Sequence, residues 1–255
     1  MHHAEDDRNE RGTRRTLWQN LDERLGLGAL QYSVPPHANT LGYGLGGITL
    51  ICFLILVATG FLLAQYYNPL PEAANESTRY IITTAPLGRL VRGVHYWAAQ
   101  AMVLAVSLHL IRVFVTAAYK RPREANWLIG IGLLALTSGL YFSGTVIKRD
   151  QEGYEAMLHN METARLLGGL GVWFAGEFTR SVPMLVRLYV AHVSILPALL
   201  TLFVIAHFAL VKYHGISPSP WAAEKPAPPE SFTRHARRLA GYGLPSAIRG
   251  DAPAD

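Results

Sequence analysis

Four long stretches of this chain contain no Asp, Glu, Lys or Arg, and this feature constrains its fold more than any other. An α-helix needs about 20 mostly apolar residues to cross a bilayer. Only 16% of the residues are charged, against about 25% in soluble domains. The sequence therefore predicts an all-α membrane protein, a four-transmembrane-helix bundle. Its spans fall within residues 40–71, 94–111, 127–147 and 188–211.

The basic residues outside the spans indicate the orientation of the bundle. With the N-terminus inside, 15 of the 23 Lys and Arg lie on the cytoplasmic side and 8 on the outer side. The short loop with Lys120, Arg121 and Arg123 is the clearest indicator, because short cytoplasmic loops are rich in basic residues. We expect a multi-pass protein of the bacterial inner (cytoplasmic) membrane with both termini cytoplasmic. The polar start of the chain predicts no cleavable signal peptide.

The spans divide the chain into three parts. Residues 1–39 are expected to form a cytoplasmic tail, in which residues 16–30 make an amphipathic helix at the membrane interface. Residues 40–215 form the four-helix domain, and residues 216–255 a Pro-rich, basic cytoplasmic tail. Between the last two spans, residues 148–187 contain charges and several glycines. This composition favours short helices on the outer surface.

Cysteine and charge content exclude several classes of protein. Cys52 is the only cysteine, which excludes an intrachain disulfide framework, a four-Cys iron–sulfur site and a Cys-rich zinc site. The net charge of +5 is mild and scattered along the chain. We therefore expect no nucleic-acid partner, whereas membrane lipid surrounds the spans.

Four histidines lie inside the predicted membrane spans, where ionisable residues are rare and usually functional. His95 and His109 are 14 residues apart in the second span, and His192 and His207 are 15 apart in the fourth. Fourteen helical steps miss a whole number of turns by about 40° and fifteen by about 60°, so each pair lies near one side of its helix, about 21 Å apart along the axis.

The second and fourth spans run in the same direction, so the histidines form two levels. His95 and His192 lie at the outer level, and His109 and His207 at the inner level. Two facing imidazole pairs suit two bis-histidine haems, because neutral imidazole binds iron well. Four separate hydrogen-bonded histidines remain the alternative. A zinc site or proton relay fits less well, since no carboxylate lies within a span.

Glycines repeat the same interval on the other two spans. Gly46 and Gly60 lie on the first span and Gly130 and Gly144 on the third, again 14 residues apart. Glycine allows close approach of backbone to a neighbouring group. Small-residue helix packing accounts for one such pair, whereas the shared interval on all four spans favours two haems stacked along the bundle.

Arginines near the histidines are candidate partners for haem propionates. Arg92 and Arg187 lie near the outer ends of their spans, and Arg112 lies near the inner end of the second span, with Lys212 as an additional candidate there. Snorkelling of these side chains at helix ends is the alternative.

These residues, with the segments RGVHYWAAQAMVLAVSLHLIRVF, YKRPREANWLIG, RDQEGY and LVRLYVAHVSILPALLTLFVIAHF, resemble the cytochrome b/b6 family over residues 16–220. The 15-residue step and the four-span length are similar to the b6 type, the N-terminal half of a split cytochrome b. The resemblance implies two non-covalent haem b groups, one held by His95 and His192 and one by His109 and His207.

The family resemblance also implies a function. The chain is expected to act in electron transport as the dihaem subunit of a quinol-oxidising cytochrome bc-type complex, respiratory or photosynthetic, and not to be active alone. Quinone and quinol are the implied substrates. The implied partners are a Rieske iron–sulfur protein, a second-half cytochrome b subunit similar to subunit IV and a c-type cytochrome, in a dimeric complex.

Three departures from the family pattern carry expectations of their own. Gly44 occupies the position where b6-type proteins attach a further haem through cysteine, so we expect no covalent haem. Lys148 stands where the family usually has proline. Charges between residues 155 and 180 occur where the family is more apolar.

The end of the third span is the predicted wall of an outer quinol slot. Tyr141, Phe142, Val146 and Ile147 are expected to line it, with the residues from Lys148 to Asp150 as its polar rim. Anchoring of the helix at the membrane interface is the alternative for these residues.

Two further functional readings stay open at this point. The chain is alternatively a dihaem membrane anchor that relays electrons between a redox enzyme and the quinone pool, without a bifurcating quinol site. A haem-free helical scaffold is the third reading.

Overall fold

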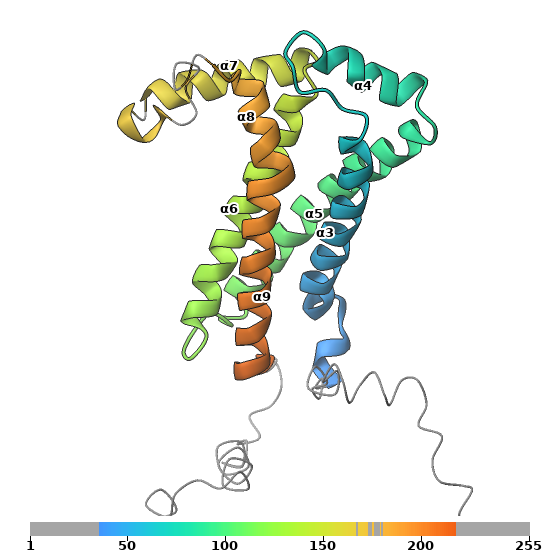
Figure 1. The fold of residues 1–255 in the computed structure, drawn as a ribbon. Helices are drawn as coiled ribbons and strands as arrows, with labels where there is room; N and C mark the ends of the chain where they lie inside the picture. Colours follow the sequence, from blue (N-terminus) through green and yellow to red (C-terminus); the bar gives the residue numbers. More distant parts are fainter. Residues whose placement is uncertain (1–35, 167, 173–174, 176–178, 180, 218–255) are drawn as a thin grey trace, which may run out of the picture. The chain divides into compact units, whose positions relative to one another are not determined.

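The computed structural model describes residues 36–166, 168–172, 175, 179 and 181–217, which belong to one compact unit. Four helices are long and apolar enough to span a membrane, which confirms the predicted all-α, multi-pass fold. They are α3 (Leu41–Ala64), α5 (Gly88–Val115), α6 (Glu124–Ile147) and the segment Met184–His214 (Figure 1). The predicted interfacial helix at residues 16–30 and most of both tails lie outside the described residues.

The fourth span is built from three pieces rather than one regular helix. It starts as α8 (Met184–Val190), widens into the π-helical turn η6 (Ala191–Ile195) and continues as α9 (Leu196–His214). It begins four residues before the charge-free stretch, because Arg187 is accommodated within its first turns.

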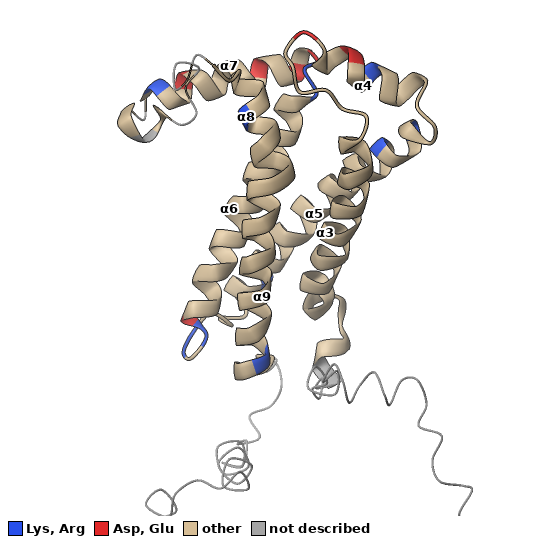
Figure 2. Ribbon diagram, in the orientation of Figure 1, with Lys and Arg blue, Asp and Glu red and all other residues tan. Residues whose placement is uncertain are grey.

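Two further helices lie at the outer end of the bundle. α7 (Gln151–Leu166) is a single 16-residue helix, where short helices were expected. α4 (Ala74–Thr83) was not predicted, because its sequence ANESTRYIIT is polar. Its buried residues Ala74 and Ile81 are seven positions apart, which places both on one face of the helix. Charged residues gather at the two ends of the bundle (Figure 2).

The bundle contains two helix pairs, α3 with α5 and α6 with α9. A middle hydrophobic layer joins them and contains Cys52, Phe53, Met102 and Leu200. Phe53 is seven residues from both Gly46 and Gly60, and Met102 is seven from both His95 and His109. The middle layer therefore separates the outer and inner histidine levels.

The outward faces of the spans carry large apolar side chains. Phe61 is 69% exposed, Leu104 62% and Leu202 60%. In water such an apolar surface would promote aggregation, whereas the hydrocarbon of a bilayer solvates it. The helices also satisfy their own backbone hydrogen bonds, as a membrane span requires.

A second hydrophobic layer joins the outer ends of α6 and the fourth span to α4. Ala74, Val146, Met184, Leu185 and Leu188 form this outer layer. The Tyr67 hydroxyl donates to the carbonyl of Ile147, the last residue of α6. Burial raises the pKa of Tyr67, which keeps the hydroxyl protonated as a donor.

Candidate functional site

The outer histidine pair lies between α5 and the π turn of the fourth span. The ring centres of His95 and His192 are 6.3 Å apart, and the ring planes make an angle of 63°. Each Nδ1 contacts a hydroxyl oxygen from a neighbouring helix. The Thr59 Oγ1 to His95 Nδ1 distance is 2.9 Å, and the Ser143 Oγ to His192 Nδ1 distance is 3.0 Å.

These hydroxyl contacts favour one tautomer of each histidine. Thr59 Oγ1 lies 2.7 Å from the carbonyl of Ile55, and Ser143 Oγ lies 2.7 Å from that of Gly139. A hydroxyl has one proton to donate, and the carbonyl accepts it. The histidine Nδ1 therefore acts as the donor, which leaves the Nε2 lone pair available for a metal.

The inner histidine pair lies at the second level of the bundle, between α5 and α9. The ring centres of His109 and His207 are 6.5 Å apart, and their planes make an angle of 72°. Both Nδ1 atoms are buried and have no hydrogen-bond partner within the described part of the chain. The structure thus brings together the two pairs that the helix intervals suggested.

The separation of the rings fits one iron between each pair. Metal–imidazole bonds are about 2 Å long, and the centre of a five-membered ring lies roughly 1.1 Å from each ring atom. Two imidazoles on opposite sides of one iron therefore have centres about 6.2 Å apart. Across the described residues, no group of three or more His, Cys, Asp and Glu side chains gathers at a metal-binding distance. Each site thus offers two imidazoles, which are fewer ligands than a metal ion held by protein side chains alone requires.

Each of the four glycines faces one of the four histidines. A Cβ atom at Gly60 would lie 3.3 Å from Cε1 of His95, and one at Gly46 would lie 3.3 Å from Cε1 of His109. On α6, a Cβ at Gly144 would lie 2.9 Å from Cε1 of His192. A Cβ at Gly130 would be 3.8 Å from Cε1 of His207, an ordinary contact. Three of the glycines therefore permit a close helix–histidine approach.

An inner cavity of about 420 Å³ surrounds the inner histidine pair. Several buried polar atoms on its wall have no partner among the described residues. They are Nδ1 of His109 and His207, one guanidinium nitrogen each of Arg112 and Arg123, and Oδ1 of Asn126. Buried polar atoms without a partner are costly in a protein, so this wall suits a large apolar group with acidic substituents, as haem is.

Two residues of the inner cavity were missed by the sequence reasoning. Arg123 and Asn126 line it, although the segment YKRPREANWLIG that contains them indicated only a basic loop and a family resemblance. Arg112 stacks on the Tyr43 ring at 3.6 Å from its centre. Lys212, considered as an inner partner, is exposed and does not line the cavity. Arg123 is therefore the second cation of the inner site.

The outer arginines lie near the outer histidine pair along their helices. Arg92 is half-buried one turn before His95. Arg187 donates to the carbonyl of Ala175 at 2.8 Å, which ties the first turns of the fourth span to the preceding segment.

The prediction that the end of α6 lines an outer quinol slot is wrong in part. Val146 is completely buried in the outer layer, and Phe142 and Ile147 pack against the same layer. These three side chains fill the corner where α6, α7 and α8 meet, so they do not form an open wall. Tyr141 points to α5, where its hydroxyl accepts a hydrogen bond from Gln100 at 3.0 Å.

The polar residues after α6 form a closed corner. Lys148 makes ion pairs with Asp150 and Glu152. Burial alone would lower the pKa of Lys148, but these two carboxylates raise it above its ordinary value. Asp150 also accepts a hydrogen bond from the Gly153 amide at 2.9 Å. Lys148 therefore stabilises the turn between α6 and α7.

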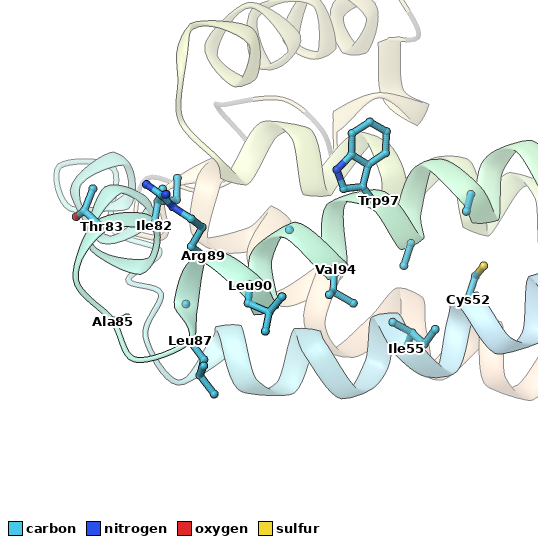
Figure 3. A pocket seen from close by; sticks show the side chains of 14 residues that line it. Cys52, Ile55, Ile82, Thr83, Ala85, Leu87, Arg89, Leu90, Val94 and Trp97 are labelled. Atoms are coloured by element: carbon cyan, nitrogen blue, oxygen red, sulfur yellow. The ribbon is translucent and has the colours of Figure 1, made fainter.

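A separate hollow of about 1140 Å³ lies along α3, α4 and α5 and is lined by none of the four histidines (Figure 3). Leu87, Leu90 and Trp97 on its wall are 72%, 63% and 70% exposed. This hollow is an open, lipid-facing surface, so it is not a candidate cofactor site.

Comparisons with known proteins agree with this architecture. The family described as Cytochrome b/b6/petB matches residues 30–215. The chain is 41% identical over 207 residues to "Cytochrome b6" of Heliobacterium modesticaldum, covering 77% of this chain and 97% of that protein. A second "Cytochrome b6", from Heliomicrobium gestii, is 40% identical with the same coverage.

A solved structure shares the fold as well. The "Hyperthermophilic respiratory Complex III" contains a chain that matches with a TM-score of 0.68 and 25% identity, over 87% of this chain. The present chain spans 64% of the length of that longer chain.

Proposed function

Because the chain belongs to the cytochrome b/b6 family, which binds b haems, we propose that it is the dihaem b6-type subunit of a bc-type quinol oxidoreductase complex. The observation that carries this proposal is the pair of facing histidine couples, 6.3 Å and 6.5 Å between ring centres, at two depths of one bundle. When bound, haem supplies one-electron oxidation and reduction at each depth.

The residues of this chain would hold the two haems as follows. His95 and His192 would hold the outer haem, and His109 and His207 the inner one. Gly46, Gly60 and Gly144 allow the first and third spans to approach these rings closely, and Gly130 faces His207 at an ordinary distance. Arg112 and Arg123 would neutralise the acidic substituents of the inner group, and Arg92 and Arg187 those of the outer one.

The surroundings of the two sites suit electron transfer across the membrane. The middle layer of Phe53, Met102 and Leu200 is apolar and excludes water between the two levels. Moving one elementary charge across 100 mV changes the free energy by about 2.3 kcal/mol. Two sites at different depths therefore couple electron movement to the membrane potential.

Quinol oxidation requires more than this chain provides. We propose that a Rieske iron–sulfur protein, a second-half cytochrome b subunit and a c-type cytochrome complete a dimeric complex in the inner membrane. The burial of Val146 and the packing of Phe142 and Ile147 against the outer layer support this, because these side chains form no open apolar wall for a quinol. We further propose that both termini, within residues 1–39 and 216–255, lie in the cytoplasm, which the distribution of basic residues supports.

A spectrum and an activity assay test this proposal together. Purified chain should contain two haems, released by acidic acetone, and show a b-type band in the reduced-minus-oxidised spectrum. The complex copurified with its partners should oxidise quinol, whereas the isolated chain should not. A purified, folded chain without a b-type band would refute the proposal and support the haem-free scaffold.

The dihaem anchor is the second candidate. Lys148 stands where the family usually has proline, and it forms ion pairs with Asp150 and Glu152. This departure from the family pattern beside the outer site supports the anchor as an alternative function. If the copurified complex contains both haems and a redox enzyme, yet no Rieske protein and no quinol oxidation, the anchor function is the correct one.

A further inference from the structure

The fourth span contains one more residue between its histidines than the second span does. His95 and His109 are separated by 14 positions, and His192 and His207 by 15. In a regular α-helix, 14 steps end about 40° short of a whole number of turns and 15 steps end about 60° past it. The two spans would therefore diverge by about 100° if both were regular.

The structure shows no such divergence. Both pairs of rings face each other at nearly the same separation, 6.3 Å at the outer level and 6.5 Å at the inner level. α5 is continuous α-helix through both of its histidines. The compensation for the extra residue must therefore lie in the fourth span.

The π turn η6 lies at the required place. The amide of Leu196 donates to the carbonyl of Ala191, five residues back, rather than to the residue four back. A turn with this wider hydrogen bond contains one residue more than an α-helical turn. His192 lies at the start of this turn, so most of the extra length falls between His192 and His207.

Pro197 gives a local reason for the wide turn. It lies in the first turn of α9, directly after η6. Proline has no amide hydrogen, and its ring collides with the carbonyl four residues earlier, here that of Val193. Widening the preceding turn moves this carbonyl away from the ring.

We propose that η6 is a register element that absorbs the extra residue, so that His192 faces His95 while His207 faces His109. The inference rests on the proposed function, and it assigns the role to the π turn as a whole rather than to any one of its side chains. With the π turn, the 15 steps from His192 to His207 cover the same rotation as 14 steps of regular α-helix. This rotation ends about 40° short of a whole number of turns, as the rotation from His95 to His109 on α5 does. Val193, Ser194 and Ile195 are all exposed at the side of the span, so one of them is dispensable.

Single-residue deletions test the proposal in the full chain expressed with its natural partners. Deletion of Ser194, and separately of Ile195, should convert the π turn into a regular α-helical turn. Both variants should retain two haems per chain and two components in a redox titration. The matched control is deletion of Leu104, an exposed residue between the histidines of α5, where no π turn exists. It leaves 13 steps, about 140° short of whole turns, and should reduce haem content below two.

Every outcome decides the question. If the wild-type chain has no haem, the proposed function fails. If the wild type has two haems but both π-turn deletions have fewer, or neither accumulates in the membrane, the register proposal is wrong. Retention of two haems after deletion of Leu104 would also overturn it, because register would then not limit haem binding.

Discussion

The hydroxyl oxygen of Ser143 lies 3.0 Å from Nδ1 of His192, while its own proton is directed to the carbonyl of Gly139 at 2.7 Å. Ser143 thus accepts a hydrogen bond from the imidazole, and the opposite nitrogen of His192 is left for the metal. An acceptor on the distal ring nitrogen makes an axial histidine more basic.

Replacing Ser143 with alanine should raise the midpoint potential of the outer haem, because a less basic histidine stabilises the oxidised iron less. A net hydrogen bond is worth about 1 kcal/mol, so the shift should be on the order of tens of millivolts. Redox titration followed at the b-type band measures it. Ser138→Ala is the matched control on the same helix, since the Ser138 hydroxyl donates to the carbonyl of Leu134 and contacts no histidine among the described residues. Equal shifts in both variants would contradict this role of Ser143.

Gly144→Ala should disturb the outer haem more than Gly130→Ala disturbs the inner one. The added Cβ would lie 2.9 Å from His192 in the first case and 3.8 Å from His207 in the second. The first contact forces the histidine or the helix to move, whereas the second is ordinary van der Waals distance. Haem content and the two midpoint potentials report the difference. Gly42→Ala, with open space around the added atom and outside the lining of the inner cavity, controls for helix propensity.

His207→Leu should remove the inner haem and leave the outer one. The middle layer of Phe53, Met102 and Leu200 separates the two levels, so loss of one group leaves the other pair of ligands in place. The haem content should fall from two to one per chain, with the component of the outer haem retained in a redox titration. Loss of the outer component alone would show that the assignment of levels is reversed.

Arg123→Gln should lower the midpoint potential of the inner haem by tens of millivolts, since a nearby positive charge favours the reduced form. Arg123 lines the inner cavity, and its side chain donates to the carbonyl of His214 at 3.3 Å. Arg121→Gln is the control from the same loop, because the Arg121 side chain is 95% exposed and pairs with Glu124. If the two variants shift the inner potential equally, Arg123 has no special position in the site.

Haem staining of the chain on a denaturing gel should be negative. Gly44 occupies the position of the attaching cysteine in b6-type proteins, and Cys52 is buried in the middle layer beside Phe53, Met102 and Leu200. A haem-positive band that persists after denaturation would identify Cys52 as the attachment point, which Cys52→Ala would test.

Some features of the site followed from the sequence because an α-helix fixes the angular relation of residues within one span. The charge-free stretches predicted four spans, and the 14- and 15-residue intervals placed each pair of histidines and glycines on one side of its helix. The basic loop at Lys120 and Arg121 predicted which end of the bundle faces the cytoplasm. These are properties of single helices, which 3.6 residues per turn determines without reference to a partner.

Other features depended on how the helices are rotated and packed against each other, which no single interval contains. Packing decided that Gly144 faces His192 and that Val146 is sealed in the outer layer instead of lining a slot. It brought Arg123 from a surface loop to the inner cavity. It also placed the π turn where Pro197 and the extra residue of the fourth span are accommodated together. The sequence determined which residues share a helix face, and the tertiary structure decided what each face meets, because rotation about a helix axis is set by all of its neighbours at once.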